Sequence, residues 1–89
     1  MQAVISVTGK DCIGIIAKTS NMCAKYDVNI VDVSQTILQN YFAMIMLVDI
    51  DKITIPFTEF VDIMTEMGKE NNLEIHTMHE DIFNSMHRI

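Results

Sequence analysis

The chain has 89 residues, enough for one domain with one hydrophobic core and too few for a catalytic domain beside a separate regulatory one. Hydrophobic residues make up 49% of it and charged residues 20%, a composition typical of a chain that folds throughout. The formal net charge is −6 and the six Lys and Arg are scattered, which argues against nucleic acid as a partner. We therefore expect a single domain over residues 1–89.

Neither a membrane span nor an export signal is predicted. The apolar run AMIMLV, residues 43–48, is far shorter than the roughly 18 apolar residues that a spanning helix needs. No charged and apolar leader precedes the first expected strand. We expect a cytoplasmic protein with no membrane partner, in which Cys12 and Cys23 are free thiols.

The first part of the chain predicts a strand, a turn and a helix. The β-branched residues of Gln2–Thr8 favour a strand, and the polar turn Gly9–Cys12 follows it. Asp11 is placed to cap a helix that ends near Tyr26. The expected buried stripe of this helix repeats at steps of three and four: Ile13, Ile16, Ala17, Ser20, Cys23 and Ala24.

The segment VNIVDVSQTILQNYFAMIMLVDI, residues 28–50, predicts two strands folded back on each other. β-Branched residues dominate both halves, and only Gln39–Asn40 resembles a turn. In the second strand apolar residues alternate onto both faces, with Phe42, Met44, Met46, Val48 and Ile50 on one and Tyr41, Ala43, Ile45 and Leu47 on the other. Both faces of this strand are therefore expected to be covered.

The last part predicts a helix, a strand and a short terminal helix. Thr54 can cap the first helix, with Pro56 in its first turn, and the helix should end near Asn71 and Asn72. Its expected buried stripe is Phe57, Phe60, Val61, Met64 and Met67. The strand is Leu73–His79. The segment EDIFNSMHRI then favours a short helix, capped by Asp81 and burying Ile82, Phe83 and Met86.

This order of elements predicts an α+β fold of the ferredoxin-like kind. In that β-α-β-β-α-β unit, two helices cover one face of a four-stranded antiparallel sheet, and here a short C-terminal helix follows. The other face of the sheet stays open. Because the chain is too short to cover it, the second apolar face of residues 41–47 implies a partner surface, most simply that of a homodimer.

Several motifs resemble those of the ACT domain over essentially the whole chain. These are TGKDCIGIIAKTS, NIVDVSQTIL and YFAMIMLVDI, which are most similar to the ACT segments of the glycine-cleavage repressor and formyltetrahydrofolate deformylase group. The tail LEIHTMHEDIFNSMHRI resembles that of small stand-alone ACT proteins. The resemblance implies a regulatory module that binds an amino acid or related small metabolite at a homodimer interface. The ligand-binding residues that it implies are Gly9, Lys10, Asp11, Cys12, Ile13 and Gly14, with Asn29 and Ile30 opposite.

Physical chemistry allows two readings of this turn. A helix N-terminus offers unpaired amides and partial positive charge, and glycines let a ligand carboxylate approach the backbone. Alternatively, Gly9 and Gly14 only permit the backbone path and close packing of helix on strand, while Asp11 only caps the helix. The charge of Asp11 would compete with a ligand carboxylate, and Lys10 could offset it.

Other chemistry has weaker support in the sequence. Cys12 at a helix start could be reactive, and His76, His79 and His87 could bind a metal, although their spacing matches no standard signature and hydrogen bonds that pin the tail would explain them equally. No phosphate-binding glycine loop, nucleophile elbow or HExxH is present, so we expect neither an enzyme nor a cofactor. The alternative function is an effector-free subunit that docks on an enzyme or regulator.

Overall fold

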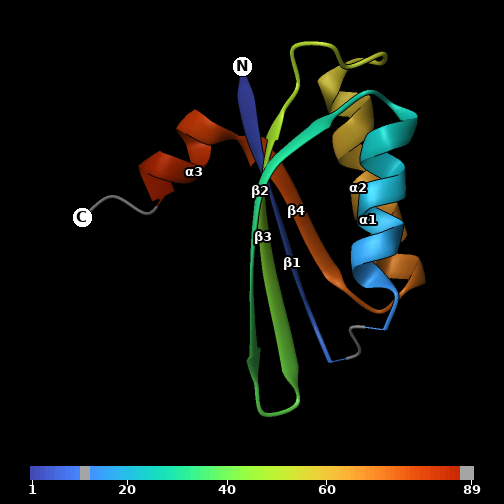
Figure 1. Cartoon of the computed structure of the whole chain (residues 1–89), viewed down its shortest axis with the longest axis vertical. Helices are drawn as coiled ribbons and strands as arrows, with labels where there is room; N and C mark the ends of the chain where they lie inside the picture. The colour runs from blue at the N-terminus through green and yellow to red at the C-terminus, as the bar shows by residue number, and fades with distance from the viewer. Residues whose placement is uncertain (11–12, 87–89) are drawn as a thin grey trace.

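The computed structural model describes residues 1–10 and 13–86 (Figure 1). Its elements are β1 (Gln2–Gly9), α1 (Ile15–Lys25), β2 (Asn29–Leu38), β3 (Tyr41–Asp49), α2 (Phe57–Glu70), β4 (Glu74–His79) and α3 (Glu80–Met86). The strands form one sheet in the order β2-β3-β1-β4, and every neighbouring pair is antiparallel. The predicted ferredoxin-like fold is confirmed.

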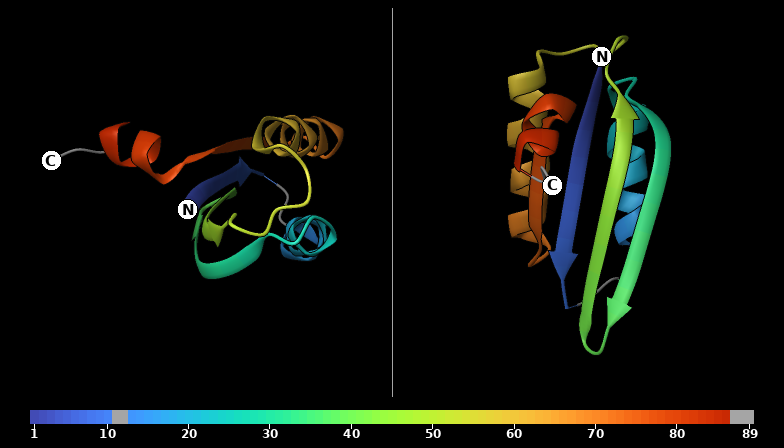
Figure 2. Two further views of the ribbon diagram at one scale, coloured as in Figure 1. Left: turned by 90° about the horizontal axis from the view of Figure 1, so that it is seen from above. Right: turned by 90° about the vertical axis from the view of Figure 1, so that its left-hand side faces the viewer.

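The two long helices and the short one lie on opposite sides of the sheet. Figures 1 and 2 show α1 and α2 side by side on one face, with α3 on the other side, near the end of β4. No helix in the described part of the chain has both the length and the apolarity to span a bilayer.

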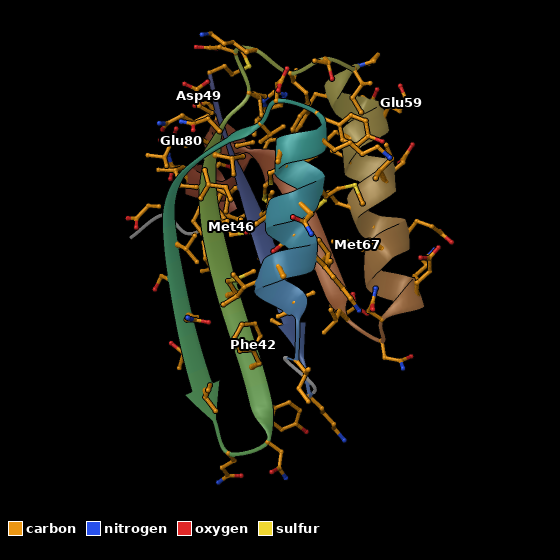
Figure 3. The ribbon with its side chains drawn as sticks, turned by 45° about the vertical axis from the view of Figure 1, so that its right-hand side comes forward. Phe42, Met46, Asp49, Glu59, Met67 and Glu80 are labelled. Atoms are coloured by element: carbon orange, nitrogen blue, oxygen red, sulfur yellow. The ribbon has the colours of Figure 1, made fainter. Side chains whose placement is uncertain are left out.

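The core lies between the sheet and the pair α1 and α2 (Figure 3). The predicted alternation in β3 is confirmed, because Met44 and Met46 are 1% exposed while Tyr41 and Ile45, on the opposite face, are 57% and 45% exposed. The other fully buried large side chains include Ile5, Val7, Ile15, Val48, Phe60 and Met64. One apolar layer therefore fixes the sheet against both helices.

The predicted start and buried face of α1 are wrong. The helix begins at Ile15, and its buried residues are Ile15, Thr19 and Cys23, whereas Ile13, Ile16, Ala17 and Ala24 are exposed. Isoleucines at 13, 15 and 16 leave the apolar stripe ambiguous in the sequence. Burial of Thr19 is tolerated because its Oγ1 donates a hydrogen bond to the carbonyl of Ile15 at 2.9 Å. Asp11, the predicted cap, lies outside the described residues.

The predicted cap of α2 is also wrong, although its buried face is confirmed. Pro56 occupies the N-cap position, and its carbonyl accepts the backbone N–H groups of Glu59 and Phe60. A residue that precedes proline avoids helical backbone angles, so the helix cannot begin at Thr54. The buried residues Phe60, Met64 and Met67 belong to the predicted stripe.

The tail helix does not bury the residues expected of it. α3 begins at Glu80, one residue before the predicted cap Asp81, and none of its residues is buried. Ile82 and Met86 are 52% and 64% exposed, because α3 stands on the side of the sheet away from α1 and α2, where it contacts β1 and β4. Ile82 and Met86 thus face solvent, whereas Phe83, the third residue expected to be buried, is half-buried.

Candidate functional site

The turn from β1 into α1 leaves the start of the helix open. Gly14 is the N-cap residue with φ of 72°, and no side chain among the described residues caps the helix. Among the described residues, no acidic side chain stands in the first turn of the helix, where the N-terminus carries a partial positive charge. Asp11 and Cys12, which the sequence also placed in this turn, lie outside the described residues.

The two glycines of this turn have different roles. A Cβ on Gly9 would lie 2.3 Å from Cδ2 of Leu73, so this glycine permits close packing. A Cβ on Gly14 would meet nothing within 4 Å, and its positive φ is the reason for glycine there. Gly9 therefore has a packing role, whereas Gly14 is required by its backbone angle and not by a close neighbour among the described residues.

Lys10 places a cation beside the hairpin of β2 and β3. Its Nζ lies 5.8 Å from the centroid of the Tyr41 ring, within range of a cation–π interaction. Both residues line a shallow pocket with Ile37 and Phe42. No local pattern in the sequence indicates this contact, which depends on the pairing of Gly9 with Phe42 across β1 and β3.

The other two predicted site residues lie at the far end of α1. Asn29 and Ile30 open β2, just after the last turn of the helix. Eleven helical residues separate them from the turn at Gly14, a distance of about 16 Å along the helix axis. Ile30 is partly buried against the core, whereas Asn29 is exposed. Within one chain, the predicted residues therefore form two separate clusters.

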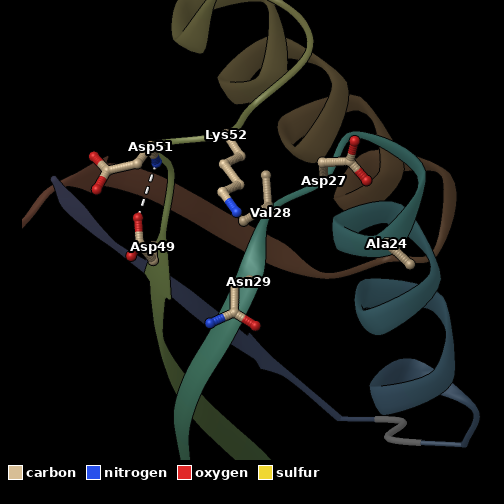
Figure 4. A pocket seen from close by; sticks show the side chains of 7 residues that line it. All are labelled: Ala24, Asp27, Val28, Asn29, Asp49, Asp51 and Lys52. Atoms are coloured by element: carbon tan, nitrogen blue, oxygen red, sulfur yellow. Dashed lines mark hydrogen bonds between the residues drawn. The ribbon is translucent and has the colours of Figure 1, made fainter.

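Asn29 lines a surface pocket with a volume of about 830 Å³ (Figure 4). Ala24, Asp27, Val28, Asn29, Asp49, Asp51 and Lys52 line it. Asn29 faces Asp49 across β2 and β3, and one carboxylate oxygen of Asp49 accepts the backbone N–H of Asp51 at 2.9 Å. Three carboxylates and one ammonium, close to the negative C-terminal end of α1, make this pocket acidic.

Asp51 is already paired with the start of the chain. Its carboxylate accepts a hydrogen bond from the N-terminal ammonium of Met1, and this bond raises the pKa of the amine. The sequence carried no signal for this contact, which the central position of β1 in the sheet produces. The pocket is also lined by Asp27 and Asp49.

The remaining candidates for chemistry have structural roles in the described part of the chain. Cys23 is buried, as predicted, and burial raises the pKa of its thiol to about 11. The ring of His79 lies against that of Phe57, with 4.4 Å between centroids. His87 lies outside the described residues, and no three His, Cys, Asp or Glu side chains of the described part gather as a metal site.

Comparisons with known proteins agree with the observed fold and also identify related sequences. A family model described as the ACT domain matches residues 1–77. A UPF0237 protein of Listeria innocua is 48% identical over the full length of both chains. An ACT domain protein from Streptococcus pneumoniae superposes with a TM-score of 0.81 and 37% identity, covering 93% of each chain.

Two larger proteins share the fold. A formyltetrahydrofolate deformylase from Pseudomonas syringae has a TM-score of 0.78 at 21% identity, over 88% of this chain and 27% of that one. A putative glycine cleavage system transcriptional repressor has a TM-score of 0.68 at 20% identity, over 85% of this chain and 43% of that one. The two groups named from the sequence motifs are thus both found among the structural neighbours.

Proposed function

This chain belongs to the ACT domain family, and we propose that it is a non-catalytic regulatory module that senses an amino acid at a homodimer interface. ACT domains are, as a family, regulatory modules that bind small ligands such as amino acids. One observation supports the proposal most directly: a positive cluster and an acidic cluster stand at opposite ends of α1, next to an unpaired strand edge.

That unpaired edge belongs to β2. The strand pairs with β3 on one side only, and residues 31–37 are all exposed. Val31, Val33 and Ile37 are 49%, 40% and 70% exposed. An edge strand this long and apolar tends to pair with another chain unless it is covered. A second copy that supplies its own β2 in antiparallel orientation would satisfy both edges.

A two-fold axis at β2 would bring the two clusters together. Antiparallel pairing reverses the direction of the partner, so Asn29 of one chain faces the end of the partner strand near the hairpin. The hairpin lies beside Lys10, close to the turn that ends at Gly14. Residues about 16 Å apart in one chain thus become neighbours across the interface, in two equivalent sites per dimer.

The opposed charges of such a site match a zwitterion. The helix N-terminus after Gly14 and the ammonium of Lys10 suit a carboxylate. Asp27 and Asp49 of the other chain suit an α-ammonium group. An α-amino acid satisfies both halves, whereas a carboxylic acid without the amine satisfies only one.

A thermal-shift screen tests this function. The purified protein is heated with each of the twenty amino acids and with the matching acids that lack the amine. At about a hundredfold excess over Kd, a bound ligand adds roughly 2.7 kcal/mol to the stability, which is several degrees in Tm for a small domain. We expect a response to one or a few amino acids and a weaker one to their deaminated analogues.

Two charge-neutralising variants test the site. Asp27→Asn suits the positive φ of 58° at that position, and Asp49→Asn keeps the size of the side chain. Each should weaken amino-acid binding about tenfold or more, since a lost charge-assisted hydrogen bond costs about 1.5–3 kcal/mol. Asp62→Asn, an exposed change on α2, is the control and should bind as wild type. If no amino acid in the screen raises the Tm, the sensing function is rejected, and a subunit that docks on another protein is favoured.

A further inference from the structure

A groove runs along the edge of the sheet where α2 lies beside β4. In the described sheet β4 pairs with β1 alone, so it forms the edge opposite to β2, and Figure 2 shows α2 next to it. The groove has a volume of about 230 Å³. It is lined by residues 73–78 and by Val61, Thr65 and Lys69 of α2. It shares no residue with the two pockets near the ends of α1 on which the proposed function depends.

The floor of this groove is apolar. Leu73 and Ile75 are 8% and 3% exposed, and Val61 of α2 is half-buried beside them. Steps of four residues place Val61, Thr65 and Lys69 on one side of α2. Sites for drug-sized ligands typically have volumes of about 300–1,000 Å³, so this groove suits a smaller molecule whose carbon chain covers the apolar floor.

The groove also contains a buried polar side chain without a partner. Thr77 lines the groove and is 8% exposed, and its Oγ1 has no hydrogen-bond partner among the described residues. A buried hydroxyl that lacks a partner costs stability, and nearly all such groups in folded proteins are satisfied by protein, water or a ligand. Thr77 therefore marks a place where a hydrogen-bond acceptor is missing.

Lys69 brings a cation to the other end of the groove. Residues 71–73 join α2 to β4, so Lys69 lies near the start of β4, whereas Thr77 stands four residues beyond Leu73, or about 13 Å along the strand. The side chain of Lys69 is exposed and forms neither an ion pair nor a hydrogen bond within the part of the chain that the structure describes. An ammonium group beside an apolar floor suits a carboxylate.

We propose that this groove binds a small organic acid with a second oxygen along its chain, as in an oxo acid or a hydroxy acid. The carboxylate pairs with the ammonium of Lys69, and the carbon chain covers Leu73 and Ile75. The second oxygen accepts a hydrogen bond from Thr77. One staggered step about χ1 moves the hydroxyl to the position of another substituent of Cβ, which brings Oγ1 within reach of the ligand.

Amide chemical shifts in two-dimensional NMR test the inference. The labelled protein is titrated with levulinate, an oxo acid, and with valerate, which has the same carbon chain without the oxo group. Ligands of this size bind with Kd on the order of millimolar. We expect the amides of Thr65, Ile75 and Thr77 to shift with both acids, and levulinate to bind up to about tenfold more tightly because it alone accepts the hydrogen bond.

Thr77→Val removes the hydroxyl and keeps the shape of the side chain. The variant should fold, since the lost hydroxyl had no partner. It should bind levulinate no more tightly than valerate. Thr19→Val removes a buried hydroxyl of α1 and, as the control, should keep the preference for levulinate.

Lys69→Gln tests the other end of the groove and should weaken the binding of both acids about tenfold or more. Lys25→Gln removes a positive charge from α1, outside the groove, and should leave both affinities unchanged. The Lys69→Gln protein should also keep the amino-acid thermal shift, so this proposal and the proposed function fail separately.

Three outcomes would overturn the inference. The first is equal affinity of the wild type for levulinate and valerate. The second is an absence of shifts at Thr65, Ile75 and Thr77 when each acid stands at about ten times the millimolar Kd expected. The third is a set of shifts confined to Gly14 or Asn29, because these residues belong to the proposed amino-acid site.

Discussion

The backbone N–H of Leu73 donates a hydrogen bond of 2.8 Å to the carbonyl oxygen of Gly68, where α2 gives way to β4. Gly68 is buried, and a Cβ built on it would lie 2.8 Å from the carbonyl oxygen of Leu73 and 3.0 Å from Cγ1 of Ile75. The first of these neighbours is backbone and cannot move without moving β4. The glycine thus sets how closely α2 approaches the edge strand of the sheet.

We expect Gly68→Ala to destabilise the protein. Alanine gains up to about 1 kcal/mol over glycine in helix propensity, but overpacking against a fixed backbone atom costs about 1–3 kcal/mol. The net loss in the free energy of unfolding should be about 1–2 kcal/mol, measured by urea denaturation. Ser20→Ala, a change at a half-buried position on α1 that adds no atom, is the control. A Gly68→Ala protein as stable as wild type would show that α2 can move away from β4 freely.

Thr77 presents a buried hydroxyl without a hydrogen-bond partner among the described residues. It is 8% exposed and lies on the core-facing side of β4, beside Ile5 of β1. Valine has nearly the same shape and no polar atom to desolvate. Thr77→Val should therefore raise the free energy of unfolding, by about 1 kcal/mol.

Thr19 provides the matched control for that change. Its Oγ1 donates to the carbonyl of Ile15 at 2.9 Å and lies 3.1 Å from that of Ile16. Thr19→Val removes a satisfied hydroxyl, so it should leave stability unchanged or lower it by up to about 1 kcal/mol. Equal effects of the two valine substitutions on the urea midpoint would contradict the difference in hydrogen bonding.

Much of the fold was predictable because apolar residues recur at every second position along its strands. In β3, alternation of large apolar residues over the whole strand determines which side chains face α1 and α2, and Met44 and Met46 lie where the pattern placed them. The face of α1 was harder to predict. Ile13, Ile15 and Ile16 fit two different buried stripes of an α-helix. Because Gly14 is the N-cap, the helix begins at Ile15, and the stripe that contains Ile15 is the buried one.

The site was less predictable, for a different physical reason. Motif resemblance named Gly14 and Asn29 together, but α1 lies between them in one chain, and they share a site only in the dimer that we propose. The contact of Lys10 with Tyr41 depends on strand register, which local patterns do not encode. The burial predicted for Ile82 was wrong because the sequence shows an apolar helix face without showing which surface covers it.

The N-terminal amine gives a prediction that involves pH. Its bond to Asp51 raises the pKa of the amine above the ordinary value of 8.0. A group whose pKa is raised on folding contributes stability that is present below pH 8 and is lost as pH rises through the folded value. Asp51→Asn should bring the pKa of the amine back toward 8.0, measured from the pH dependence of amine acylation at low temperature. Asp62→Asn, far from Met1, should leave that titration unchanged.

Cys23 gives the second pH-dependent prediction. Here too the stability should fall as pH rises, but over a more alkaline range. Burial raises the pKa of its thiol from 9.0 to about 11, so the folded chain retains a proton that the unfolded chain loses. The free energy of unfolding should therefore fall between pH 9 and pH 11, by an amount on the order of 2 kcal/mol at 1.36 kcal/mol per unit.

Cys23→Ala isolates this contribution of the thiol. The variant has a lower stability at pH 8 because it leaves a cavity, but it lacks the titrating group. Its difference from wild type in urea denaturation should therefore narrow as pH rises from 9 to 11. A difference that stays constant over this range would show that Cys23 ionises as easily in the folded chain as in the unfolded one, and that α1 opens to solvent far more often than its burial indicates.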